Sequence, residues 1–236
     1  MKIYIFSAAI TLVMSTSTFA DFGLIYDKDG YVNLREEMNL NSKIIGTVDN
    51  NEVISCILEE KKSKFCFVNL DSGRDGYIFK DRVNFFKDYK KIVLKNSTQN
   101  TSVFKGDGVE VNIYAKNFNS DKIEFIKEGG GYYLGGKMVF GTDNAVPNKD
   151  YLQLEKIEIK HDDRDVIIPY DILKGYFFPR KSLDGMSEIS KFNVYIKGQD
   201  LYLVNQFNSG GAGAYNVIFH IKNNKLNKIK AWGEQF

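Results

Sequence analysis

Residues 30–83 read GYVNLREEMNLNSKIIGTVDNNEVISCILEEKKSKFCFVNLDSGRDGYIFKDRV. Short runs of Val, Ile, Phe and Tyr, which favour strands, alternate there with clusters of Gly, Asn, Asp and Ser, which favour turns. The pattern predicts strands at Gly30–Arg35, Ile44–Val48, Glu52–Leu58, Phe65–Leu70 and Tyr77–Phe79. Short strands at this spacing, with too few apolar residues for two packed sheets, predict a small closed barrel.

The same stretch resembles the bacterial SH3 family. The pieces that carry the resemblance are Gly-x-Val-Asn-Leu-Arg, Ile-Ile-Gly-Thr-Val, Glu-Val-Ile, Gly-Tyr-Ile and Arg-Val, in that order, and they cover about residues 24–86. The resemblance implies an SH3-like barrel of five strands over residues 21–88, which contacts peptidoglycan or another protein. The chain departs from the family at Phe65, where a Trp is common, and near Met38, where the long loop usually has a Pro.

The resemblance also implies a ligand groove between the long first loop and the last strand. Aromatic and charged side chains in or beside that groove are the first candidates for binding a partner: Tyr31, Arg35, Glu36, Glu37 and Tyr77. The alternative is that both tyrosines cover the barrel core and that the charges are only solvated.

The first twenty residues have the order of a secretory signal peptide: Lys2, an apolar run from Ile3 to Met14, and small residues that end at Ala20. The apolar run is shorter than the roughly 20 residues that span a bilayer. No cysteine follows it to accept a lipid. We therefore expect cleavage after Ala20 and a periplasmic or secreted product without an integral membrane anchor.

Cys56 and Cys66 are the only cysteines of the chain. In an exported protein such a pair is expected to form a disulfide, although two buried free thiols are the alternative. If the hairpin is centred on Lys61, Cys56 faces Cys66 directly, with Cα atoms roughly 4.5 Å apart.

Residues 89–236 predict a second domain, mainly antiparallel β and of no recognised family. Its expected strands are 109–115, 122–127, 131–140, 151–159, 166–170, 192–197, 200–207, 214–221 and 226–232. One short helix is expected over Tyr170–Tyr176, before Pro179. The apolar phase shifts between Leu154 and Ile157, which indicates a bulge. The fold class is therefore all-β.

The chain offers little for catalysis. It has two histidines, His161 and His220, no cysteine after Cys66 and no His-Glu-x-x-His motif, so we expect neither a zinc nor a thiol hydrolase, no metal and no cofactor. A formal net charge of +2 argues against a nucleic-acid partner. The polar cluster after His161, which contains Asp162, Asp163 and Asp165, is expected to be a solvated turn.

These observations favour a non-enzymatic exported protein that binds peptidoglycan or an exported protein. Its more specific form is an immunity or inhibitor protein against a cell-wall-directed toxin or hydrolase. The alternative is a carboxylate-based cell-wall hydrolase or lyase, for which Asp162, Asp163 and Asp165 would supply the chemistry and the SH3-like domain the targeting.

Overall fold

The computed structural model describes residues 20–58, 62–119, 123–182, 184–209 and 211–233. The described chain is all-β, with a single short α-helix, α1 (Tyr170–Leu173). The expected signal peptide lies outside the described residues except for Ala20, whose backbone begins the first strand. Within the described residues, no helix has the length and apolar character needed to cross a membrane.

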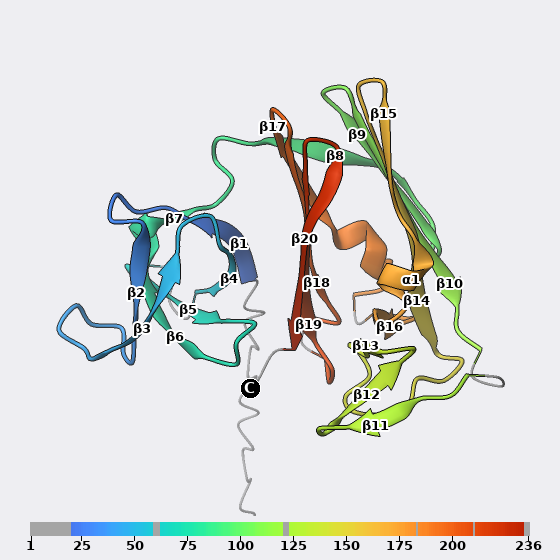
Figure 1. Cartoon of the computed structure of the whole chain (residues 1–236), viewed down its shortest axis with the longest axis horizontal. Helices are drawn as coiled ribbons and strands as arrows, with labels where there is room; N and C mark the ends of the chain where they lie inside the picture. The colour runs from blue at the N-terminus through green and yellow to red at the C-terminus, as the bar shows by residue number, and fades with distance from the viewer. Residues whose placement is uncertain (1–19, 59–61, 120–122, 183, 210, 234–236) are drawn as a thin grey trace, which may run out of the picture.

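Residues 20–88 form the first unit, a curved sheet with the strand order β3-β2-β6-β5-β4-β1-β7 (Figure 1). Its strands are β1 (Ala20–Ile25), β2 (Tyr31–Arg35), β3 (Ile44–Asp49), β4 (Val53–Ile57), β5 (Phe65–Asn69), β6 (Asp75–Phe79) and β7 (Val83–Asn84). The five strands predicted from the sequence are β2 to β6. Strands β1 and β7 were not predicted; β1 joins the sheet by pairing with β4 and β7.

One apolar core fills the inside of this curved sheet. It contains buried side chains from all seven strands, among them Leu34, Cys56, Val68 and Ile78. Alternate residues of each strand point inward, as the period of a strand requires. The first unit therefore has the barrel-like packing that the sequence predicts.

The disulfide between Cys56 and Cys66 is present, with Cα atoms 5.4 Å apart. The predicted register was wrong, because Cys56 pairs with Val68 and Ile57 with Phe67. The hairpin is thus centred on Lys62, and Cys66 lies diagonally across from Cys56 on the same inward face. Both sulfur atoms are in the buried core.

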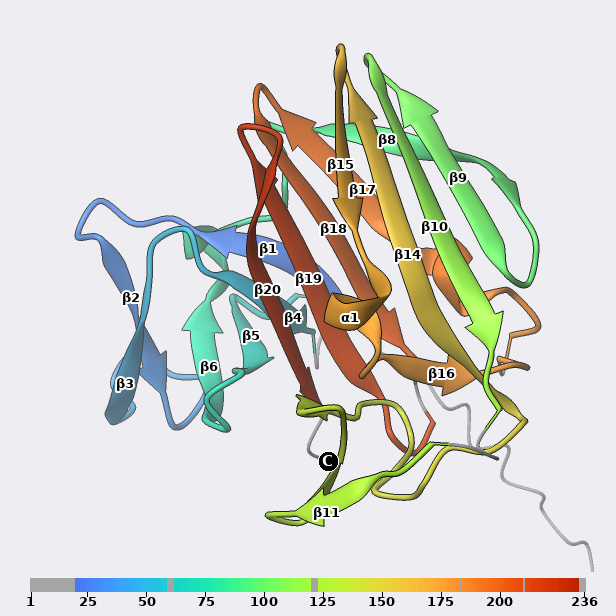
Figure 2. The same cartoon turned by 45° about the vertical axis from the view of Figure 1, so that its right-hand side comes forward.

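Residues 89–233 form the second unit, whose main sheet has the order β15-β14-β10-β9-β8-β17-β18-β19-β20, with β16 paired to β14 (Figure 2). All its ladders are antiparallel, and its edge strands β15 and β20 approach each other, so the sheet nearly closes. The strands are β8 (Lys90–Ser97), β9 (Thr101–Gly106), β10 (Val109–Asn117), β14 (Tyr151–His161), β15 (Arg164–Ile168), β16 (Phe177–Pro179), β17 (Asn193–Lys197), β18 (Asp200–Phe207), β19 (Tyr215–Lys222) and β20 (Lys225–Gly233). A small sheet of β11 (Ile126–Glu128), β12 (Gly131–Leu134) and β13 (Lys137–Met138) lies apart from it.

Several local predictions for this unit are confirmed. The bulge expected between Leu154 and Ile157 is present, because Tyr114 pairs with Lys156 and Ala115 with Leu154. The final meander is β18-β19-β20. Asn223 and Asn224 have φ values of 51° and 55°, as a tight hairpin turn demands.

Other boundaries differ from the prediction. Strands β8, β9 and β16 were missed, and the strand expected over residues 131–140 is divided into β12 and β13 by Gly135 and Gly136, which both have positive φ. Of the strand expected at 122–127, the described part forms a strand only from Ile126. The helix ends at Leu173 instead of Tyr176, because Gly175 and Tyr176 pair with Phe140.

The two units are joined by an apolar junction. Phe22, Leu24 and Val53 of the first unit pack with residues on the outer face of β18, β19 and β20, namely Tyr202, Val204, Ile218 and Trp232. The connecting residue Phe86 stacks on Tyr195, with ring centroids 4.3 Å apart. In Figure 1, strands β18 to β20 stand between the first unit and the rest of the second.

Candidate binding face on the first unit

A row of side chains crosses the outer face of the first unit. Direct cross-strand pairs join Ile57 of β4 to Phe67 of β5, Phe67 to Tyr77 of β6, and Tyr77 to Arg35 of β2. All four side chains are half-buried. They share one face because directly opposed residues of a sheet point the same way, away from the core that holds Cys56 and Val68. We call these four residues the aromatic row.

A second aromatic pair borders the row. Phe65 and Phe79 are opposed on β5 and β6, and their rings meet edge to face at 5.2 Å. Phe67 and Tyr77 have the same arrangement at 5.5 Å. Edge-to-face pairs of this kind stabilise a sheet by about 0.5–1.5 kcal/mol each, so the rings are held in fixed positions.

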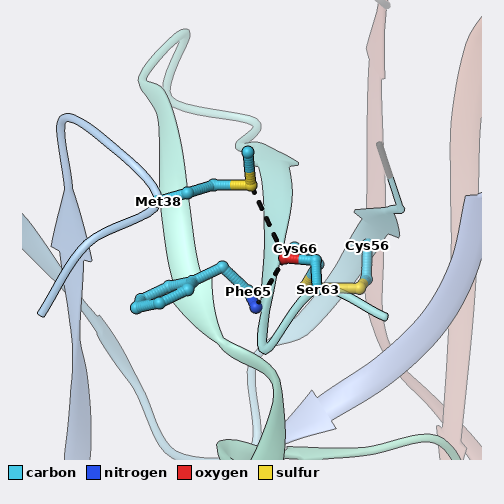
Figure 3. Close-up of a disulfide and its surroundings, with 5 residues drawn as sticks. All are labelled: Met38, Cys56, Ser63, Phe65 and Cys66. Atoms are coloured by element: carbon cyan, nitrogen blue, oxygen red, sulfur yellow. Dashed lines mark hydrogen bonds between the residues drawn. A yellow bond between two sulfur atoms is a disulfide. The ribbon is translucent and has the colours of Figure 1, made fainter. Parts of the chain in front are cut away.

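The long loop between β2 and β3 is anchored next to these rings. The hydroxyl of Ser63 donates a hydrogen bond to Sδ of Met38 at 3.5 Å and accepts one from the backbone N–H of Phe65 at 3.0 Å (Figure 3). Nη1 of Arg35 donates to the carbonyl oxygen of Ser42 at 2.9 Å and so closes the base of the loop. The loop therefore lies beside the aromatic row.

This loop and the first two residues of β3 expose apolar side chains to solvent. Met38, Leu40, Ile44 and Ile45 are all exposed, and Leu40 reaches 59%. A concentration of exposed apolar residues next to half-buried aromatic rings is typical of a surface that binds a partner.

Gly76 allows β2 and β6 to meet at the row. A β-carbon on Gly76 would lie 2.6 Å from the carbonyl oxygen of Arg35 and 3.0 Å from the Leu34 side chain. Only a residue without a side chain permits this approach, which brings Arg35 beside Tyr77.

The structure brings together some of the residues that the sequence singled out. Arg35 and Tyr77 are direct neighbours in the row, and Glu36 and Glu37 follow Arg35 into the exposed loop. Tyr31 is 45% exposed but lies at the other end of β2, roughly 13 Å from Arg35 along the strand. Sequence reasoning missed Ile57, Phe67 and Phe79. The strand period places Ile57 and Phe67 on the outward face in either register, so the missing information was the register and strand order that make these residues neighbours of Tyr77 and Arg35.

The carboxylates of the second unit are only partly brought together. Asp162 and Asp163 line a shallow hollow of about 560 Å³ with Arg164, Gln199 and the Asn223–Asn224 turn, whereas Asp165 does not line it. The Asp162 side chain is 67% exposed. In the described part of the chain, no group of three or more His, Cys, Asp or Glu side chains is placed to hold a metal ion.

Ion pairs fix the first unit to β20 on the side of the junction. Nζ of Lys228 contacts Glu52 at 2.8 Å, and Lys230 bridges Glu52 and Asp71. Partial burial would raise the pKa of Glu52, but the hydrogen bonds from Lys228 and Lys230 outweigh it and hold that pKa below its usual value. These contacts hold the first unit at a fixed position on the second.

No family model matches this chain, and the searches of curated proteins and of solved structures found no match either.

Proposed function

We propose that the chain is an exported, non-enzymatic binding protein that captures a protein partner on the outer face of its first unit. The observation that carries the proposal is the aromatic row, with the exposed apolar loop beside it. Tyrosine, phenylalanine and arginine are enriched at the centres of protein interfaces, and rings that are already fixed lose little side-chain entropy when a partner covers them.

The charges around the row add specificity. Arg35 ends the row, and Glu36 and Glu37 follow it in the exposed loop. Charges at the rim of an interface contribute more to the orientation and association rate of a partner than to its binding affinity. An inhibitor or immunity protein against an exported cell-wall toxin or hydrolase is the specific form of the proposal, because that role requires a binding face and no chemistry of its own. The resemblance of residues 24–86 to the bacterial SH3 family supports the same face.

The test is capture from an envelope extract by the immobilised exported form. Tyr77→Ala and Arg35→Ala should each weaken capture of the partner by about 2 kcal/mol or more, a factor of roughly 30, since truncated anchors at an interface centre have this cost. Tyr26→Ala is the matched control, because Tyr26 is 72% exposed and lies outside the row. Circular dichroism and thermal unfolding confirm that each variant is folded.

Sedimentation with purified peptidoglycan separates the two partner classes. The proposal expects the protein to remain in the supernatant, or to sediment equally with and without the Tyr77→Ala change. If the protein sediments with peptidoglycan, if this depends on Tyr77 and Arg35, and if no protein is captured, then the aromatic row binds peptidoglycan and not a protein. If neither substitution weakens capture, the aromatic row does not bind the partner.

A second candidate function rests on the hollow that Asp162 and Asp163 share. Two carboxylates facing one space can act as general acid and base on a glycosidic bond. Release of soluble fragments from peptidoglycan by the wild type, and its loss in Asp162→Asn and Asp163→Asn, would favour this hydrolase or lyase over the binding protein.

A further inference from the structure

The second unit covers part of the sheet face that carries the aromatic row. Two residues from the row along each strand, Ser55 of β4 pairs with Asn69 of β5, and Asn69 pairs with Asp75 of β6. The strand period places these three side chains on the same outer face as the aromatic row. Ser55 and Asn69 are nevertheless only 1% and 6% exposed. Another part of the molecule must therefore lie over them.

That cover is the outer face of β18, β19 and β20 (Figure 1). Phe22 pairs directly with Ser55 and packs in the junction, as does Val53, two residues before Ser55. Asn69 and Trp232 line one cleft of about 220 Å³ at the edge of the junction. We call Phe22, Ser55 and Asn69 the covered row. The outer face of the first unit is thus divided between the accessible aromatic row and the covered row beside it.

The junction buries polar groups that have no partner. The Ser55 hydroxyl, both polar atoms of the Asn216 amide and Nε1 of Trp232 are buried and make no hydrogen bond within the described residues. Asn216 and Trp232 are directly opposed on β19 and β20, so they share the face that lies over the first unit. A buried polar group without a partner has lost its bond to water without replacement. Separation of the units returns water to these groups, so it costs less free energy than separation of a fully apolar junction.

The connection between the units is strained. Phe86 has a φ of 54°, whereas every other non-glycine residue with positive φ in the described chain is Asn or Asp. A bulky side chain rarely adopts this conformation, which persists only where surrounding contacts enforce it. Here the contacts are the stack of Phe86 on Tyr195 and its edge-to-face contact with Tyr89 at 5.2 Å. Withdrawal of the Phe86 ring from the junction would release this strain.

We propose that the second unit is a reversible cover of the partner-binding face: the first unit swings away from β18–β20 about Phe86, and the partner binds the aromatic row and the covered row together. This inference rests on the proposed function, because the partner is the protein that the aromatic row captures. The docked arrangement, held by the ion pair of Glu52 and Lys230, is the major state. The partner selects the minor open state, so its apparent affinity is reduced in proportion to the fraction of molecules that are open.

The covered row indicates which kind of partner fits. It places the ring of Phe22 beside the hydroxyl of Ser55 and the amide of Asn69. The centres of protein interfaces combine apolar side chains with a small number of direct hydrogen bonds. The fitting partner is therefore a folded protein whose contact surface is apolar and carries hydrogen-bonding groups opposite Ser55 and Asn69.

Opening is measured first without any partner. Cys56 and Cys66 are bonded to each other, so a single introduced cysteine reports the accessibility of one site. The Ser55→Cys thiol lies under the second unit, whereas the Ile54→Cys thiol, on the preceding residue, faces the core of the first unit. In the full exported chain, a maleimide should react about tenfold or more faster with Ser55→Cys, because separation of the units requires less free energy than unfolding of the first unit. Val32→Cys serves as the core control if Ile54→Cys does not fold.

Equal labelling rates at the covered and core positions would mean that the junction opens only when the first unit unfolds. That result would overturn the proposal. Circular dichroism confirms that each labelled variant is folded before the rates are compared.

A covalent bridge tests whether capture requires opening. Glu52→Cys and Lys230→Cys, introduced together, place two thiols where the ion pair joins the units. One sample is bridged with a bis-maleimide, and a matched sample of the same variant is alkylated with N-ethylmaleimide. In capture from the envelope extract, the bridged form should hold about tenfold less of the partner whose capture depends on Tyr77, since the bridge confines it to the docked arrangement.

The outcomes separate this inference from the proposed function. If the bridged and alkylated forms capture the partner equally, and capture still depends on Tyr77, the second unit is not a cover, and the binding role of the aromatic row stands. If no form captures a protein through Tyr77, the proposed function fails and this inference fails with it, whatever the labelling rates.

Discussion

Two residues, Cys56 and Cys66, hold the β4–β5 hairpin beside the candidate binding face. Their disulfide closes a loop with a sequence separation of 10 residues inside the core of the first unit. Ser63, which anchors Met38 of the long loop, lies within that closed loop. The bond therefore stabilises both the core and the support of the loop.

Replacement of both cysteines by alanine should lower the free energy of unfolding by about 3 kcal/mol, as the chain-entropy model gives for a loop of this length. Urea unfolding followed by circular dichroism measures the difference. Reductant should produce a loss of similar size in the wild type and none in the double variant. A wild type that is equally stable with and without reductant would show that the bond contributes nothing.

At the scale of elements, the approach of β2 to β6 decides whether the aromatic row exists. Arg35 and Tyr77 are the only residues through which these two strands pair in the described chain. Gly76 makes that approach possible, because its neighbours leave no room for a β-carbon.

Gly76→Ala should therefore destabilise the first unit by about 1–3 kcal/mol, the usual cost of forcing a methyl group into a packed site. The nearest contact is a backbone oxygen, which cannot move away as a flexible side chain would. Gly73→Ala is a suitable comparison for steric crowding, because a β-carbon there has no neighbour within 4 Å and only its positive φ is unfavourable. Thermal unfolding measures both, and a larger loss for Gly73→Ala would contradict the steric argument.

At the scale of the whole molecule, the junction makes one body of the two units. Apolar packing of Phe22, Leu24 and Val53 against the outer face of β18–β20 is flanked by the Glu52 and Lys230 ion pairs. Lys230 is partly buried, which would lower its pKa, but Glu52 and Asp71 raise that pKa above its usual value.

The stability of this junction should depend on pH at both extremes. The pKa of Glu52 is depressed in the folded protein, so its contribution is present above the unfolded value of 4.5 and is lost as the pH falls through the lower folded value. The pKa of Lys230 is raised, so its contribution is present below 10.5 and is lost as the pH rises through the higher folded value.

Urea unfolding as a function of pH, followed by emission of Trp232 at the junction, measures this dependence. Glu52→Gln should flatten the acid limb below pH 4.5, whereas Glu37→Gln, a change of an exposed loop residue, should leave it as in the wild type. An acid limb that Glu52→Gln does not alter would mean that other carboxylates control it.

The sequence by itself determined what depends on neighbouring residues along the chain. Alternation of apolar and polar residues predicted β2 to β6 and the final meander, and Asn223 and Asn224 predicted a turn with positive φ. The bulge near Leu154 was readable as a phase shift in one strand. The disulfide was predictable because the chain has only two cysteines and they are close in sequence.

Only the tertiary structure decided what depends on strands that are distant in the chain. A shift of the hairpin centre from Lys61 to Lys62 changed the partner of Cys56, and cross-strand pairing across four strands placed Ile57, Phe67, Tyr77 and Arg35 in one row. The tertiary structure also decided the pairing of β1, the cleft beside Trp232 and the junction between the two units. The physical reason is that the period of a strand fixes which side chains share a face, whereas sheet order, register and docking are set by the burial of apolar surface between segments that no local pattern pairs.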